Sequence, residues 1–225
     1  VLKNQFPQFL TPSDWSTKFG GQNWGAITFQ GDGVVKVSGN QPKIAVGDTL
    51  GAPPFRDIEV TIYYKRGVNE DMAGGLSFGL RKGKAYSQAT DGNPCNTNTY
   101  YGRMFHDGDM ECFKGDMAFS LFNSYDELNN VNGESRERYP IWGGKRLPTG
   151  QWIGMPFVAY NIEDDTQVKL ELYRDLSDGV NGGAWEKIGE TIDSGGWGST
   201  SECDYPPDFV PVDGEGMMDQ QVSRF

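Results

Sequence analysis

The residues best suited to chemistry fall on two predicted strands, residues 76–81 and 100–106. Both alternate apolar and polar types, which predicts one buried face and one wet face. The wet face is predicted to carry Arg81 on the first strand and Tyr101 and Arg103 on the second. Arginine binds carboxylates in a bidentate way, so this cluster suits an acidic polysaccharide, with the tyrosine ring offering a flat face to a sugar. Two further cations complete the predicted substrate-binding set: Lys84 and Lys114.

A base is available beside this cluster. His106 is the single histidine of the chain. β-Elimination on a uronate needs a base of histidine or tyrosine type and a cation on the carboxylate. His106 with Arg103, or Tyr101 with Arg103, would supply both as catalytic residues. The simpler alternatives are a surface histidine next to a turn, and solvated arginines that balance nearby acids.

Hydrolysis has less support in the sequence. It requires two carboxylates about 5–10 Å apart. The alternating acids of residues 107–111 are interrupted by the turn residue Gly108, and Glu59 and Glu171 each stand alone on their strand faces. We therefore expect elimination in preference to hydrolysis.

A loop rich in oxygen donors is a candidate metal site. Asp175, Asp178 and Asn181 are interleaved with glycines, and calcium prefers six to eight oxygen ligands. The spacing differs from that of an EF-hand, and an ordinary hairpin loop explains the same residues equally well. A structural Ca²⁺ ion is an expectation, and no other cofactor is predicted.

The surrounding elements are predicted to be β-strands throughout. Residues 58–65 alternate clearly, residues 100–106 and 110–114 form a hairpin around an Asp-Gly turn, and residues 150–197 form a three-stranded antiparallel meander. Residues 123–149 are interpreted as a long loop, and residues 221–225 as the start of a last strand. Nine to twelve strands predict one all-β domain over residues 1–225, a two-sheet antiparallel β-sandwich of jelly-roll type.

Bulk properties exclude some classes of function. The formal net charge of −11 over 225 residues disfavours binding to nucleic acid phosphates. No run of 18 apolar residues occurs, so no membrane insertion is expected. The chain shows no signal-peptide pattern at its start, which a processed secreted protein would also lack. We expect a secreted or cell-surface protein, with an undetermined oligomeric state.

The three cysteines leave their pairing open. Cys95 and Cys112 could close a loop whose disulfide would stabilise the fold by about 3 kcal/mol. Cys203 would then be left over, or would pair with one of the two. The spacings do not match a zinc site.

Several of these segments resemble the concanavalin A-like lectin/glucanase superfamily. The likeness rests on the run from Phe55 to Thr61, the hairpin from Gly102 to Lys114, and the segments GQWIGMPFVAYN and VKLELYRD. The likeness covers most of residues 55–197. More narrowly, the chain is similar to uncharacterised archaeal and microbial secreted proteins of that superfamily. The superfamily includes lectins, glucanases, and alginate and glucuronan lyases. The resemblance therefore implies a jelly roll and a glycan ligand.

The segment FVAYN around Tyr160 resembles the catalytic-tyrosine strand of alginate lyases, in which the pattern Lys-x-Gly-x-Tyr-x-Gln is usual. Tyr160 matches the tyrosine, but Pro156, Val158 and Ile162 replace the lysine, glycine and glutamine. We therefore assign Tyr160 to core or edge packing and give it no catalytic role.

Three hypotheses follow from the sequence. The first is a polysaccharide lyase acting on a uronate-containing glycan, the second a non-catalytic glycan-binding module, and the third a cell-surface structural module. The lyase needs a base and a cation in one groove. The binding module needs aromatic and polar groups but no base.

Overall fold

A computed structural model of the chain describes twelve strands arranged in three antiparallel sheets. The described residues are 26–29, 34–38, 43–46, 56–67, 75–82, 98–106, 109–116, 138–140, 142, 145–196, 205–212 and 215–221. Within this part of the chain, the helical element is a short 3₁₀ turn, η4 (Val180–Gly182). The predicted all-β class is confirmed in that the described elements are antiparallel strands.

The first of the two large sheets has four strands in the order β11-β10-β9-β4. Their bounds are β4 (Ile58–Lys65), β9 (Trp152–Ile162), β10 (Gln167–Arg174) and β11 (Glu186–Asp193). β9, β10 and β11 pair consecutively and antiparallel, as predicted for the meander of residues 150–197. β4 joins the other edge of β9.

The second large sheet has six strands in the order β3-β12-β5-β6-β7-β8. Three come from segments where strands were predicted: β5 (Gly75–Lys82), β6 (Asn98–Phe105) and β7 (Asp109–Asp116). The other three are β3 (Lys43–Val46), β8 (Arg138–Pro140) and β12 (Glu215–Gln221). β8 lies inside the predicted loop of residues 123–149, and the last strand begins earlier than residues 221–225, so both of those boundaries were wrong. A separate pair comprises β1 (Ala26–Phe29) and β2 (Val35–Ser38).

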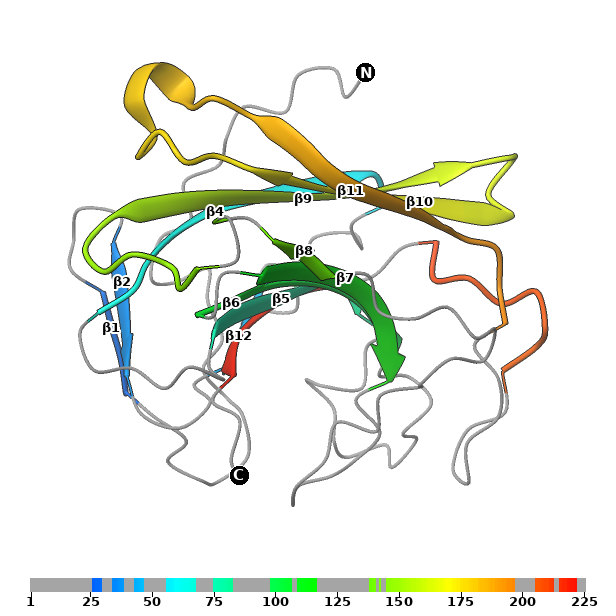
Figure 1. The fold of residues 1–225 in the computed structure, drawn as a ribbon. Coiled ribbons are helices and arrows are strands. Elements are labelled where there is room, and N and C mark those ends of the chain that lie inside the picture. The colour runs from blue at the N-terminus through cyan, green and yellow to red at the C-terminus, as the bar shows by residue number, and fades with distance from the viewer. Residues whose placement is uncertain are drawn as a thin grey trace.

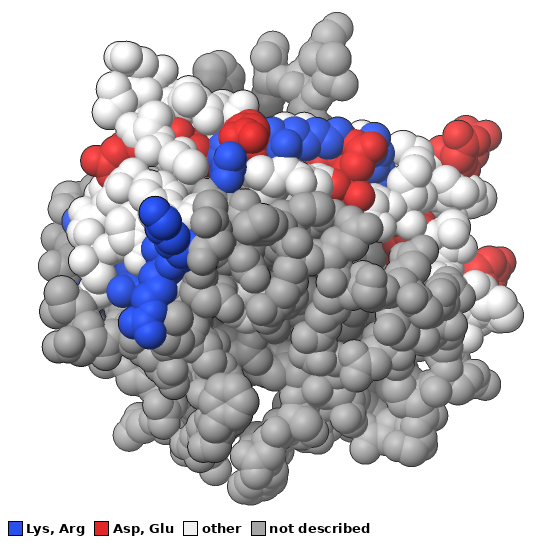
Figure 2. All heavy atoms as spheres, in the orientation of Figure 1, with Lys and Arg blue, Asp and Glu red and all other residues white. Residues whose placement is uncertain are grey.

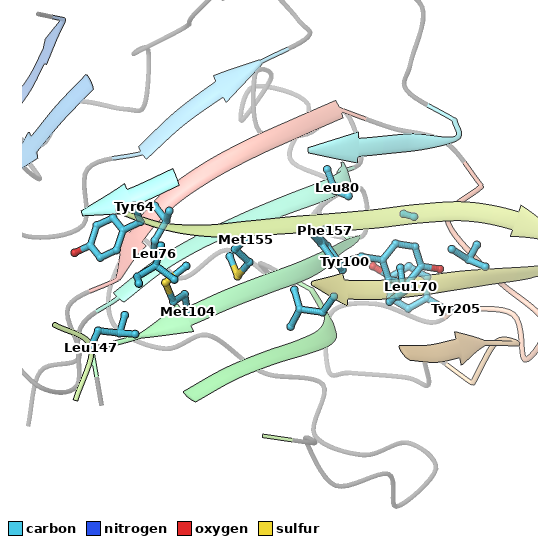
Figure 3. Packing of buried hydrophobic residues seen from close by; sticks show 14 residues of the cluster. Tyr64, Leu76, Leu80, Tyr100, Met104, Leu147, Met155, Phe157, Leu170 and Tyr205 are labelled. Atoms are coloured by element: carbon cyan, nitrogen blue, oxygen red, sulfur yellow. The ribbon is translucent and has the colours of Figure 1, made fainter. Parts of the chain in front are cut away.

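The two large sheets face each other across one apolar core. Figure 1 shows the six-stranded sheet curving beneath the four-stranded one, with its concave face turned away from it. Leu76 and Leu80 from β5 belong to the same buried cluster as Phe157 and Leu170 from the opposite sheet, and all four are at most 3% exposed (Figure 3). Gly102 is required at the centre, because a Cβ there would come within 2.9 Å of the Phe157 ring. Period-two burial on β10 confirms the alternation read from the sequence.

Candidate functional site

Four of the predicted groove residues belong to strands of the six-stranded sheet, and the two whose side chains are described, Arg81 and Tyr101, are buried. Tyr101 belongs to the face of β6 opposite Tyr100 and Met104, as predicted, but only 1% of it is exposed. Arg103 pairs in register with Ser77 and Glu111. Its side chain and that of Lys114 lie outside the described residues, as does the whole of Lys84.

Arg81 corrects the prediction most clearly. It was expected on the wet face, yet it is fully buried and reaches the four-stranded sheet, donating to Asn161 Oδ1 at 2.5 Å and to the Pro211 carbonyl at 3.1 Å. The cause is a β-bulge: the register between β5 and β12 shifts here, and Arg81 adopts a positive φ of 56°. A bulge breaks the strict alternation of a strand and re-aims a side chain. The predicted Arg81–Arg103 pair on one face is therefore wrong.

His106 is buried, so the surface interpretation is wrong as well. It is 1% exposed, and its Nε2 lies 2.6 Å from the hydroxyl of Tyr64, with the two rings nearly parallel. Its carbonyl accepts bonds from the Leu147 amide and from Arg66. This packing places the imidazole inside the molecule, at the end of β6. A catalytic role for His106, Tyr101 or Arg103 stays a prediction.

The predicted calcium loop is organised by hydrogen-bond donors around one carboxylate. Asp175 is fully buried, and its Oδ1 accepts bonds from the amide and hydroxyl of Ser177 and from the Ala184 amide. Its Oδ2 accepts from the Tyr63 hydroxyl at 2.9 Å and from the Gly179 amide at 3.2 Å. Burial opposes ionisation, but these bonds outweigh it and lower the pKa of Asp175 to about 2.

The other two predicted metal ligands are arranged separately. Asp178 accepts a bond from the Trp152 amide at 2.7 Å, and Asn181 occupies a left-handed conformation in η4. Within the described residues, no three His, Cys, Asp or Glu side chains gather closely enough to hold a metal ion. The calcium site stays a prediction, while the hydrogen bonds assign Asp175 a structural role in this loop.

The loop that Asp175 organises ends in an exposed aromatic ring. Trp185 is 43% exposed, and its ring lies 5.8 Å from that of Tyr63. Its indole covers two glycines, since a Cβ on Gly154 or Gly183 would approach the ring to 3.0 or 2.8 Å. A large apolar ring is thus held in one place on the outer face of the four-stranded sheet.

Beside Trp185 lies a hollow of about 550 Å³, which we call the outer hollow. Strand β9 forms its floor, and β4 and β10 flank it. At 3.4 Å per residue and 4.8 Å per strand, it is about 14 Å long from Pro156 to Tyr160 and about 10 Å wide from Glu59 to Glu171. Its lining residues are Asp57, Glu59, Pro156, Val158, Tyr160, Asn161, Glu171, Tyr173 and Trp185.

One wall of the outer hollow is a network of charges and phenols centred on Glu171. The Lys187 ammonium and the Tyr173 hydroxyl each donate to this carboxylate at 2.8 Å, and the Tyr160 hydroxyl donates at 3.3 Å. Burial works against the charged form, but these partners lower the pKa of Glu171. Burial and Glu171 together raise the pKa of Tyr173. The carboxylate therefore stays ionised and the phenol stays neutral.

The same network offsets the repulsion between two neighbouring carboxylates. Glu171 and Glu190 are direct cross-strand neighbours, an arrangement that destabilises a sheet unless cations intervene. Lys169 lies 3.1 Å from Glu190, and Lys187 contacts both acids. These contacts raise the pKa of both lysines, and Figure 2 shows acidic and basic side chains interleaved on this part of the surface. Both lysines are thus engaged by acids of the protein itself.

The far end of the outer hollow is supported from below by Arg81. Asp57 and Asn161 both line the hollow. Asp57 accepts the Asn161 amide at 2.9 Å and lies 3.5 Å from the Arg81 guanidinium, which also bonds to the Asn161 side chain. The residue predicted to bind substrate directly therefore positions two lining residues of a different site.

The outer hollow combines an apolar ring with hydrogen-bonding side chains, which are the kinds of groups that proteins use to bind polyhydroxylated ligands. Trp185 offers an apolar ring face, while carboxylates, an amide and phenols offer acceptors and donors for hydroxyl groups. The sequence assigned Tyr160 to core or edge packing, and in the structure Tyr160 is half-buried and also lines the outer hollow. The signal that could have found the site is the polar set of β10, because Lys169, Glu171 and Tyr173 share one strand face.

Comparison with protein families and with curated protein sequences gives no match. Among solved structures, the chain is similar to the marine PL-14 alginate lyase from Aplysia kurodai. The sequence identity is 10% and the TM-score is 0.39, over 88% of this chain and 77% of that chain. No helix in the described part of the chain is long and apolar enough to cross a membrane.

Proposed function

We propose that this protein binds a glycan non-catalytically in the outer hollow, on a β-sandwich of concanavalin A-like jelly-roll type. The observation that carries the proposal is the fixed, exposed Trp185 ring beside a hollow lined by hydrogen-bonding side chains. Ring stacking and hydroxyl hydrogen bonds together are what a sugar needs from a protein surface. The facing sheets with one shared core support the jelly-roll assignment.

The contacts of Glu171 argue against a role for this residue as the general acid of a hydrolase. Glu59 and Glu171 flank Val158 from the two neighbouring strands, which is a carboxylate pair that the sequence did not reveal. A general acid needs a raised pKa, whereas the pKa of Glu171 is lowered. Its bonds to Lys187 and Tyr173 also hold it in the wall of the hollow. These contacts support a structural and recognition role for the pair.

A glycan array followed by titration calorimetry tests the proposal. We expect Trp185→Ala to weaken binding of the selected glycan by about tenfold, the loss of roughly 1.4 kcal/mol of ring contact. Val180→Ala is the matched control, because Val180 is 60% exposed in the same loop and does not line the hollow. Equal affinities for the wild type and Trp185→Ala would place the binding site elsewhere.

A uronate lyase remains a second candidate on the six-stranded sheet. It is favoured by the backbone position of Tyr101 and Arg103, two residues apart on β6 and next to Gly79 and Ser77 of β5. Arg81 cannot serve as a second cation for this candidate, because its guanidinium bonds to Asn161 inside the molecule. Incubation with alginate, glucuronan and pectin, read by absorbance of the unsaturated product, tests it. No product on any uronate polymer would remove this candidate. Activity that persists in both Tyr101→Phe and His106→Ala would keep the lyase and show that the assigned base is wrong.

We also propose that the protein is secreted. We further propose that a structural Ca²⁺ ion binds in the loop that begins at Asp175. A rise in melting temperature on adding CaCl₂, reversed by chelation and absent in Asp178→Asn, would support the ion. An unchanged melting temperature would assign the loop to hydrogen bonding alone.

A further inference from the structure

The charges around the outer hollow lead to a narrower conclusion about its ligand. We infer that the hollow takes an uncharged glycan chain and discriminates against polyuronates, an inference that rests on the proposed glycan-binding function. It reverses the acidic ligand expected from the sequence. The reason lies in where the cations of this region are directed.

Among the described residues, the lining of the hollow carries acidic groups and no cation. Asp57, Glu59 and Glu171 are the charged residues of that described lining. Glu59 is exposed, and its carboxylate accepts a bond from the Thr61 hydroxyl at 2.9 Å. A ligand carboxylate in this space would lie close to Glu59, and like charges at such distances repel.

Three described cations on the segments around the hollow have acidic partners. Lys187 bonds to Glu171 and Glu190, and Lys169 bonds to Glu190. Arg56, at the other end, pairs with Asp165. To bind a uronate, one of these cations would have to leave its own carboxylate, which would then add to the repulsion.

Arg81 is withheld from the ligand by geometry. Its side chain is fully buried beneath Asp57 and Asn161, so its bidentate donors are not presented to the hollow. Hydroxyl groups meet the opposite situation, because Glu59 and Asp57 are acceptors that a neutral sugar can satisfy. With a length of about 14 Å along β9, the hollow exceeds a single sugar ring and suits a chain.

Calorimetry with matched oligosaccharides tests this inference. The probes are hexasaccharides of glucose and mannose, a hexamer of mannuronate and a hexamer of glucosamine, each titrated at low and at high NaCl. We expect a neutral hexamer to bind at least about tenfold more tightly than the uronate at low salt. High salt should narrow that difference, since screening weakens the repulsion.

Glu59→Gln sharpens the test, because it removes the charge and keeps an acceptor. We expect this variant to reduce the ratio of the neutral-hexamer affinity to the uronate-hexamer affinity by about threefold or more. Asp208→Asn is the matched control, an exposed acid that does not line the hollow. It should leave the ratio unchanged.

The failures are distinguishable. Uronate binding as tight as neutral binding in the wild type, or a glucosamine hexamer that binds more tightly than either, would overturn the charge selectivity and leave glycan binding intact. An unchanged ratio in Glu59→Gln would assign the selectivity to another group. Absence of binding for every hexamer would overturn both this inference and the proposed function.

Discussion

The two large sheets carry similar polar side chains in opposite settings. On the outer face of the four-stranded sheet, Glu171 is surrounded by Lys187 and two tyrosines next to an open hollow. Between the sheets, Arg81 meets Asp57 and Asn161 with no exposed surface of its own. The comparison teaches that residue type alone does not identify a binding group. The outer cluster can contact a ligand, whereas Arg81 can only position the residues that do.

The largest expected effect comes from removing the inner cation. Arg81→Ala should lower the free energy of unfolding by about 3–5 kcal/mol, because it leaves a cavity in place of a fully buried side chain and leaves the Asn161 and Pro211 oxygens without their donor. Urea denaturation measures this loss, with Lys145→Ala as the control at an exposed position. A loss below about 1 kcal/mol would mean that the inner cluster contributes little and that the contrast between the two regions is overstated.

Asp175 provides the next largest effect and a pH test. Its pKa is lowered to about 2, so its stabilisation is fully present above the ordinary aspartate pKa of about 4 and is lost as the pH falls towards 2. We expect Asp175→Asn to reduce the free energy of unfolding by roughly 2 kcal/mol at neutral pH. Its deficit relative to the wild type should shrink between pH 4 and pH 2. A deficit that stays constant over this range would show that ionisation of Asp175 is not the source.

Asp175→Asn also tests the link between the loop and the hollow. The carboxylate binds the amides that precede Trp185 and the hydroxyl of Tyr63 that lies against its ring. We expect a loss of glycan affinity of about threefold to tenfold through displacement of the ring, with the protein still folded. Conservative Ser177→Ala, which removes one donor, should show a smaller loss in the same titration. Unchanged affinity in Asp175→Asn would mean that Trp185 is held without this loop.

The smallest effect is expected at the exposed end of the outer network. Lys187 is 39% exposed, and surface ion pairs contribute about 0–1 kcal/mol. Lys187→Met should therefore change the free energy of unfolding by less than about 1 kcal/mol, with most of the change removed at 1 M NaCl. Urea denaturation at two salt concentrations checks it. A salt-independent loss of several kcal/mol would place this network among the buried ones.

The periodicity of the sequence was sufficient to predict the strands of the core and which face of each strand is buried. Val168, Leu170 and Leu172 alternate with polar residues, and a period of two can bury only one set. The same reasoning located the hairpin of β6 and β7 and the meander that ends in β11. These features depend on near neighbours in the chain, which is why they can be read locally.

Which polar residues come into contact depends on strand order and register, which belong to the tertiary structure. The bulge at Arg81 turns its side chain from the expected face into the interior. A second bulge opposite Tyr173 places Lys187 on the same sheet face as Glu171. Each bulge adds one residue against the partner strand, which the alternation in a single strand does not encode. The hollow itself needs β4 beside β9, a pairing between segments about ninety residues apart in the sequence. Fold class follows from local periodicity, whereas the site follows from strand order and register.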